Sequence, residues 1–511
     1  MKCHVLLSGL IVLSMSAVSA DEYDVPVRPI GINGQVEWNA AATQFMYAPT
    51  FAFRTVKGAV KYRFVLVDEK GLSHCFEADT PHAALSPVWG ETAAGMCALK
   101  VVGVDAGGGE CGISGERKFR KMAPFCAKRY PKPEMDYRAA SRMILSYVFK
   151  RPYLEYLLRH GKPDSSYPLN SYPSKMLAAQ IVGMIRYAQL NPQDRDRALR
   201  IARLNADHLI STAQPPDAPL AYFTPTYDGR GEAGNGYLGE KFRGQHMLHY
   251  PAAVAQAFFA FSGETGEMKY RDFGIRIADT YVRLQGEDGT WWQKVDEKDG
   301  RPVADNRLVP TRIIPMLEKA AEITGNSKYH VVAMRAFGYL EKGPMADWSW
   351  DGQFEDIYPA PRYHNLSKYG PCDTAIYLLG RFPGDPRRIG QAREMLRFSE
   401  DQFVVWEAPY HPHWKTPVVL EQYHCYEPID ESVAKLISTY LALYRAEGNP
   451  TDLAKAKALG DSMTRVLLPD GRLRTYWNTD STTNENEDWV NGQVASALAL
   501  EELAAEAERS R

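Results

Sequence analysis

From about residue 136 onward, apolar residues recur at the spacing of amphipathic helices. In the segment 173–187, Leu177, Ile181 and Met184 are four and three positions apart, so they would share one face of a helix. The polar residues between them would face outward. This pattern predicts that most of the chain is helical.

Short turn motifs interrupt the helical pattern about every 60 residues. Gly, Asn, Asp and Pro at such points end one helix and begin the next. The five motifs are Asn191-Pro192, Gly266, Gly325-Asn326, Gly384-Asp385-Pro386 and Gly448-Asn449-Pro450. With an opening helical segment (136–160) and a closing helix (488–507), they predict six or seven helix pairs. The fold class is therefore mainly α, an (α/α)6–7 toroid over residues 136–511.

Before residue 125 the periodicity is that of strands. Tyr62, Phe64 and Leu66 alternate with polar or smaller residues, and a second apolar run covers 99–104. Several short strands in about 100 residues predict a small β-sandwich over 21–125, which resembles fibronectin type III-like modules. We interpret it as an accessory or spacer domain, joined to the toroid by a proline-containing linker (126–135).

Composition narrows the class of protein. The chain has 511 residues, of which 45% are apolar and 24% charged, as in a folded globular protein. The 60 basic and 62 acidic residues nearly cancel, so the chain lacks the basic excess of a nucleic-acid-binding protein. No segment reaches the roughly 20 apolar residues of a membrane-spanning helix.

The N-terminus has the pattern of a cleavable signal peptide. Lys2 precedes an apolar run from Val5 to Leu13, and Val18-Ser19-Ala20 is a small-residue cleavage site. We expect cleavage after Ala20 and a secreted or periplasmic location. Such a compartment permits disulfides, and one or two bridges are expected among the four cysteines between residues 75 and 126: Cys75, Cys97, Cys111 and Cys126.

The toroid geometry predicts where the chemistry lies. If the short turns share one rim, the long connections must gather on the other, and long loops in compact domains are usually functional. These connections cover 214–245, 286–309, 342–370, 403–427 and 469–487. They are rich in Trp, Tyr, His and carboxylates, which suits an oligosaccharide cleft as well as packing of the barrel mouth.

Three parts of these connections carry a family resemblance. The stretch 347–356 (DWSWDGQFED) leads into 362–365 (RYHN), and 403–407 (FVVWE) and 418–423 (VVLEQY) follow. Together they resemble secreted toroid proteins of polysaccharide lyase family 38. The resemblance covers the helical region and implies alginate or glucuronan lyase activity, with an acidic polysaccharide as the binding partner.

A uronate lyase removes the C5 proton beside a carboxylate and expels the glycosidic oxygen from C4. Hydrogen-bond donors or cations must offset the negative charge of the carboxylate. A base then takes the C5 proton, and an acid protonates the leaving oxygen. We assign His364 as base, Tyr423 as acid, and Asn306 with Glu355 as the carboxylate clamp. In the family, these roles are likewise carried by an Asn, a Glu, a His and a Tyr, in this order along the chain.

Further rim residues are assigned to substrate binding: Trp291, Trp348, Trp350, Arg362, Tyr363, Asn365, Lys415 and His424. The family pattern also has an Arg near the acid, and Arg362 or Lys415 would replace it here. No cofactor or metal is expected, because His246 and His249 have no third ligand at a suitable spacing.

Two other enzyme classes fit the same rim. A glycoside hydrolase would use two carboxyl groups, for which the candidates are Asp351, Glu355, Asp373, Glu427 and Asp430. A sugar epimerase would use a similar base and acid without elimination. A non-catalytic sugar-binding protein is a further alternative, although it would not need so many titratable rim residues.

Overall fold

The computed structural model describes residues 20–27, 39, 41–228, 242–477 and 488–510. The chain divides into two compact units, one of residues 1–34 and 45–124 and one of residues 35–44 and 125–511. The expected signal peptide lies outside the described residues except for Ala20, where the short helix α1 (Ala20–Asp24) begins. Within the described ranges, no helix is long and apolar enough to cross a membrane.

The smaller unit is built on an antiparallel sheet with the strand order β1-β7-β6-β3-β4. Tyr62, Phe64 and Leu66 on β3 are buried, as their alternation predicts. A second sheet pairs β2 with β5, and the ring of Phe51 on β2 lies 5.4 Å from that of Phe119 on β7. The strands and the short helix α2 are β1 (Gln44–Phe45), β2 (Thr50–Ala52), β3 (Lys61–Val67), β4 (Ser73–Ala78), β5 (His82–Ala84), α2 (Ser86–Trp89), β6 (Gly95–Val104) and β7 (Glu110–Lys121).

The expected disulfides do not form, because all six described cysteines are free thiols. Cys75 lies on β4 and Cys97 on β6, and β3 runs between these two strands. Strands two positions apart in a sheet are about 10 Å apart, whereas disulfide-linked Cα atoms lie about 4.4–6.8 Å apart. The sequence spacing could not reveal this intervening strand.

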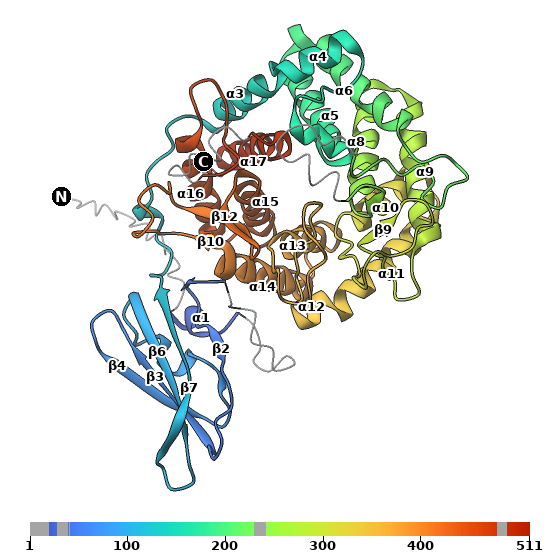
Figure 1. Cartoon of the computed structure of the whole chain (residues 1–511). Coiled ribbons are helices and arrows are strands. Elements are labelled where there is room, and N and C mark those ends of the chain that lie inside the picture. The colour runs from blue at the N-terminus through green and yellow to red at the C-terminus, as the bar shows by residue number, and fades with distance from the viewer. Residues whose placement is uncertain (1–19, 28–38, 40, 229–241, 478–487, 511) are drawn as a thin grey trace, which may run out of the picture. The chain divides into compact units, whose positions relative to one another are not determined.

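The larger unit contains, among its described residues, six helix pairs in a ring (Figure 1). The pairs are α5 (Pro173–Leu190) with α6 (Arg195–Ser211), α8 (Tyr250–Thr265) with α9 (Met268–Leu284), α10 (Ile313–Thr324) with α11 (Ser327–Lys342), α13 (Tyr369–Arg381) with α14 (Pro386–Phe403), α15 (Asp430–Glu447) with α16 (Pro450–Val466), and α17 (Val490–Arg509) with α3 (Tyr137–Phe149). Shorter elements complete it: α4 (Pro152–His160), β8 (Gln245–Met247), β9 (Lys294–Asp296), α12 (Pro344–Asp347), β10 (Val404–Val405), β11 (Val418–Gln422) and β12 (Cys425–Pro428).

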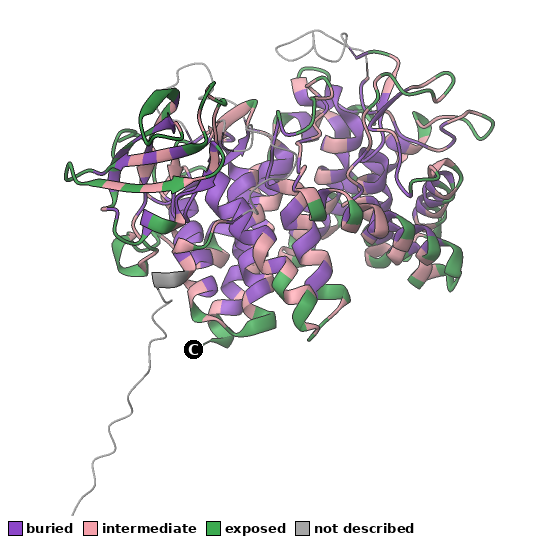
Figure 2. Cartoon of the chain, turned by 90° about the horizontal axis from the view of Figure 1, so that it is seen from below, coloured by how far each residue is buried: buried purple, intermediate pink, exposed green. Residues whose placement is uncertain are grey.

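The five predicted turn motifs each join the two helices of a pair. Gly266, Gly325 and Gly448 end their helices with φ angles of 76°, 67° and 70°, a left-handed conformation that glycine adopts without strain. Asp385 and Asn449 then cap the helices that follow: Asp385 accepts hydrogen bonds from two backbone N–H groups and Asn449 from one. Figure 2 shows buried residues along the helices and exposed residues at many helix ends.

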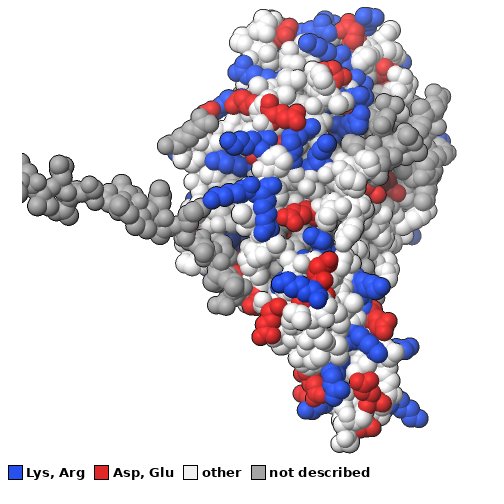
Figure 3. Space-filling view, turned by 90° about the vertical axis from the view of Figure 1, so that its left-hand side faces the viewer, with Lys and Arg blue, Asp and Glu red and all other residues white. Residues whose placement is uncertain are grey.

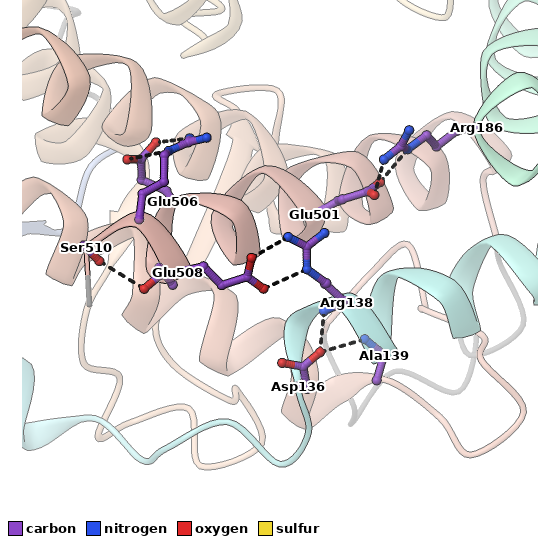
Figure 4. A network of polar contacts seen from close by, with 10 residues as sticks. Asp136, Arg138, Ala139, Arg186, Glu501, Glu506, Glu508 and Ser510 are labelled. Carbon is purple, nitrogen blue, oxygen red and sulfur yellow. Dashed lines mark hydrogen bonds and ion pairs between the residues drawn. The ribbon is translucent and has the colours of Figure 1, made fainter. Parts of the chain in front are cut away.

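The last helix closes the ring by packing against the first. Arg138 on α3 donates two hydrogen bonds to Glu508 on α17, at 2.9 and 2.7 Å, and Arg186 on α5 binds Glu501 on α17 with an Nε–Oε2 distance of 2.7 Å (Figure 4). The inner helix α17 therefore contacts both the outer helix α3 and the inner helix α5. Elsewhere in the ring, Thr311 before α10 donates to Asp373 on α13 at 3.4 Å.

Basic and acidic side chains alternate over the face of the molecule that Figure 3 shows. This mixture agrees with the formal net charge of −2.

The close contact of α5 with α17 gives a test of the ring. A Cβ atom on Gly183 would lie 2.6 Å from Cγ2 of Val494, whereas a Cβ on Gly338 in α11 would meet nothing within 4 Å. We expect Gly183→Ala to lower the free energy of unfolding by about 1–3 kcal/mol through overpacking. Gly338→Ala, the matched control, should raise it by about 0.5–1 kcal/mol. Urea unfolding measures both, and equal effects would contradict this packing.

Candidate functional site

The inner helices all begin at the rim that carries the long connections. The inner helices are α5, α8, α10, α13, α15 and α17. The chain leaves each of the first five by a short turn and follows its outer partner before the next inner helix begins, whereas α17 pairs with α3, which precedes α5 in the chain. A cavity at this rim, here called the axial cavity, is lined near the helix starts by Lys175, His249, Tyr250, Arg312, Tyr369, Asp373 and Glu431. Helix N-termini present unpaired N–H groups and a positive dipole, so their convergence favours an anionic ligand.

A buried ion pair holds two of the residues that line this cavity. Lys175 Nζ lies 2.7 Å from Oε1 of Glu355, and the hydroxyl of Tyr250 donates to the other oxygen of the same carboxylate. Burial alone would raise the pKa of Glu355, but the Lys175 ammonium and the hydrogen bond from Tyr250 keep it below its usual value. The ionised Glu355 therefore fixes the positions of Lys175 and Tyr250.

His249 presents a neutral imidazole to the axial cavity. Burial, together with the charges of Arg312, Lys175 and Lys294, lowers its pKa well below the usual value. Neither ring nitrogen has a hydrogen-bond partner within the described part of the chain, and the ring centroid lies 4.1 Å from that of Tyr250. In the described ranges, no three His, Cys, Asp or Glu side chains come together in a way that could hold a metal ion.

Arg312 provides a cation that no described residue pairs with. Its backbone oxygen accepts a hydrogen bond from Gln256, but its guanidinium makes no ion pair or hydrogen bond with any described residue. The guanidinium lies 5.9 Å from the ring centroid of Tyr250. Because the guanidinium has five N–H donors in a planar arrangement, it can bind a carboxylate through two hydrogen bonds.

Glu421 adds a carboxyl group that is partly protonated near neutral pH. Burial raises its pKa to about 7, against the opposing charge of Lys368, and burial likewise lowers the pKa of Lys368 to about 7. Lys368 Nζ donates to the backbone oxygen of Glu421 at 2.7 Å. Glu421 lines the axial cavity, so its carboxyl group can donate a hydrogen bond or a proton there.

A second cavity, here called the outer cavity, adjoins the axial cavity and has a volume of about 460 Å³. Both cavities are lined by Asp351, Gly352 and Gln353. The structure brings two of the predicted site residues, Asn306 and Arg362, together in the outer cavity. The two cavities thus share part of their walls.

The predicted base and acid lie outside the lining of the axial cavity. His364 is exposed, and the hydroxyl of Tyr423 donates to the side chain of Gln402. Their two loops do meet, because Asn365 Nδ2 donates to Gln422 at 2.7 Å, and Asn365 Oδ1 accepts from the backbone N–H of His424 at 2.9 Å. The predicted clamp residue Glu355 is held instead by Lys175 and Tyr250.

Most of the predicted aromatic binding residues are buried. Trp291 and Trp350 are 1% exposed, Tyr363 3% and Trp348 9%. Their rings pack inside the helical unit, where little of either face is open to stack on a sugar. Lys415, by contrast, is exposed and lines neither the axial nor the outer cavity.

The site residues predicted from the sequence do not include Lys175, Tyr250, Arg312 or Glu421, and His249 is named among them only as a metal ligand without partners. Lys175 and Tyr250 lie in the first turn of an inner helix, and Arg312 directly precedes one. A search for polar residues in the first turn of each predicted inner helix, and at the residue before it, would have found these three. Glu421 lies within an apolar strand, where a charged residue is itself unusual.

Comparisons with known proteins agree with this architecture. Cellobiose 2-epimerase from Spirochaeta thermophila superposes with a TM-score of 0.52 at 11% identity, covering 73% of this chain and 98% of the epimerase. This likeness shows that the helical unit has the α/α toroid fold. Neither a protein-family model nor a curated protein sequence matches the chain.

Two further solved structures are similar at lower scores. A family 76 glycoside hydrolase from a bovine Bacteroides thetaiotaomicron strain has a TM-score of 0.48 at 11% identity and covers 90% of this chain and 96% of its own. A polysaccharide lyase has a TM-score of 0.44 at 11% identity and covers 90% of this chain and 65% of its own.

Proposed function

We propose that this protein is a polysaccharide lyase that cleaves uronate-containing polysaccharides, of the alginate or glucuronan class, by β-elimination. The observation that carries the proposal is the guanidinium of Arg312, which pairs with no described residue, in a cavity that also holds a neutral imidazole and a protonated phenol. These are the three kinds of group that the elimination needs. The family resemblance of the rim loops supports the same reaction.

The reaction begins when Arg312 binds the uronate carboxylate and offsets the charge that develops on it. Protonated Glu421 can donate a second hydrogen bond to the same group. His249, neutral at working pH, takes the proton from C5, and the released electron pair forms the C4–C5 double bond. The C4–O bond breaks, and Tyr250 turns its hydroxyl from Glu355 to the departing glycosidic oxygen and donates its proton there.

Tyr250 suits the role of acid because it stays protonated. Burial and the negative charge of Glu355 raise its pKa well above the usual value. Glu355 acts on the reaction through Tyr250 and Lys175, so it is a positioning residue. Asn306 and Arg362, in the outer cavity, would bind the neighbouring sugar unit.

A glycoside hydrolase is the second candidate, and one specific observation favours it. Glu421, with its pKa raised to about 7, lines the same cavity as the carboxyl groups of Asp373 and Glu431. A hydrolase needs such a pair, with one carboxyl group protonated and the other ionised. The products separate the two reactions, because only elimination leaves a C4–C5 double bond.

The purified protein should therefore be incubated with alginate, glucuronan and glycosaminoglycans while ultraviolet absorbance is followed. A rise in absorbance with shortening of the chains supports the lyase. Shortening without absorbance would identify a hydrolase, and a change in sugar configuration with neither would identify an epimerase. Either of these two results would contradict the proposal.

The raised pKa of Glu421 predicts the pH dependence of the activity. The protonated carboxyl donates to the uronate, so kcat/KM should fall as the pH rises above about 7. Glu421→Gln keeps a neutral hydrogen-bond donor at every pH, so the fall in kcat/KM at alkaline pH should disappear in this variant. Lys368→Gln is the comparison, because the pKa of Lys368 is also about 7. If only Lys368→Gln removes the alkaline fall, Glu421 does not have this role.

A further inference from the structure

The inner helices carry partly exposed residues at positions that packing alone would bury. On α5 these are Lys175, Ala179 and Val182, and on α17 they are Ala495 and Leu498. They recur every three or four residues, so on each helix they form one stripe. The other sides of both helices are mostly buried, which means that these stripes face an open space.

The stripes of α5 and α17, together with Ala253, Gln256 and Ala257 on α8, line a cavity of about 370 Å³, here called the barrel channel. Its mouth is formed by Lys175, Arg312 and Glu431, which also line the axial cavity. Deeper in, the walls are mainly apolar and small, with Ala179, Ala253 and Ala495 among them. The volume falls within the range of about 300–1,000 Å³ that is common for ligand pockets.

The barrel channel extends well below the rim. From Lys175 to Val182 on α5, and from Asn491 to Leu498 on α17, its lining spans seven residues of helix, which corresponds to a depth of about 10 Å. Protein interiors are normally packed to high density, and larger side chains at the three alanine positions would fill this space. The wall therefore leaves room for a ligand with an apolar face.

We infer that the barrel channel binds the terminal sugar units of the polysaccharide, so that the enzyme acts from a chain end. This inference rests on the proposed function, since it places the terminal units beyond Arg312. The channel lies among the inner helices of a ring that α17 and α3 close, so the polymer reaches it along the barrel axis. A chain end can enter in this direction directly, whereas an internal segment would have to fold back on itself.

The walls match the chemistry of such a ligand. The C–H faces of a pyranose ring can pack on the small apolar side chains, and Asn491 and Gln256 supply polar groups at the sides. Arg312 at the mouth would bind the carboxylate of the uronate next to the bond that breaks. Burial of the terminal units on several sides would then hold the scissile bond at His249 and Tyr250.

The length of the first products tests the inference. Mass spectrometry of the earliest products from the best uronate polymer should show one short species, while the viscosity of the polymer falls slowly. A broad range of lengths with a rapid loss of viscosity would overturn the inference. It would leave the lyase proposal standing, because that proposal is decided by ultraviolet absorbance.

Variants that fill the barrel channel give a second test. Ala495→Phe and Ala253→Phe add a ring from two different helices and should each weaken binding of a saturated glucuronan or alginate tetrasaccharide at least tenfold by calorimetry. Ala507→Phe, on α17 but outside this lining, should bind normally. Circular dichroism identifies a variant that fails to fold, and the inference is then tested by the other channel variant. Unchanged tetrasaccharide binding in a folded channel variant would overturn the inference, whichever reaction the enzyme catalyses.

Discussion

Tyr250→Phe should lower kcat on the best uronate polymer by about 10²–10⁴-fold and leave KM nearly unchanged. The substitution keeps the aromatic ring and removes only the hydroxyl that we propose as the proton donor. A group that acts mainly in the transition state contributes to turnover more than to substrate binding. Steady-state rates from the ultraviolet absorbance of the double bond measure both constants.

Tyr423→Phe is the matched comparison, because it makes the same chemical change in the other tyrosine considered as the acid. The Tyr423 hydroxyl donates to Gln402, and Tyr423 does not line the axial cavity. We therefore expect this variant to keep most of the wild-type turnover. A large loss in Tyr423→Phe with little change in Tyr250→Phe would assign the acid to Tyr423 and contradict our proposal.

Glu355→Gln should lower the free energy of unfolding by about 3–5 kcal/mol, because it leaves the Lys175 ammonium buried without its counter-charge. The side chains of Lys175 and Glu355 are only 12% and 5% exposed. Urea unfolding measures the difference. Glu322→Gln is the control, since Glu322 and its partner Lys319 are 69% and 47% exposed, and its effect should stay within about 0.5 kcal/mol.

The effect of Glu355→Gln should depend on pH in a defined direction. The folded protein holds the pKa of Glu355 below its usual value, so the ionised form stabilises the fold above the unfolded pKa of about 4.3. This stabilisation is lost as the pH falls through the lower folded-state pKa. The difference between wild type and variant should therefore be full at pH 7 and shrink below about pH 4. A difference that grows with acidity would contradict the buried pair.

Much of the helical architecture could be predicted from the sequence because its signals are local. The turns at Gly266, Gly325 and Gly448 need a positive φ angle that glycine adopts easily, and the residues that follow begin the next helix. The strand alternation at Tyr62 and Phe64 depends likewise on neighbours in sequence. Such patterns predict where elements begin and end, and the helix pairing follows from the short turns.

The composition of the site depended on tertiary structure. Lys175, Tyr250 and Glu355 are far apart in the sequence and meet only because the ring brings different inner helices and one long connection together. Aromatic residues such as Trp291 and Trp350 look like sugar-binding residues in sequence, but the fold buries them.

The helix pairs, their turns and the rim where the long connections gather therefore follow from local patterns in the sequence. Which side chains face the cavity was decided by the closure of the ring. The absence of a partner for Arg312 among the described residues and the raised pKa of Glu421 were decided in the same way. The burial, charge and hydrogen bonding of a site depend on many residues that are distant in sequence, whereas the formation of helices and turns depends on a few neighbouring residues.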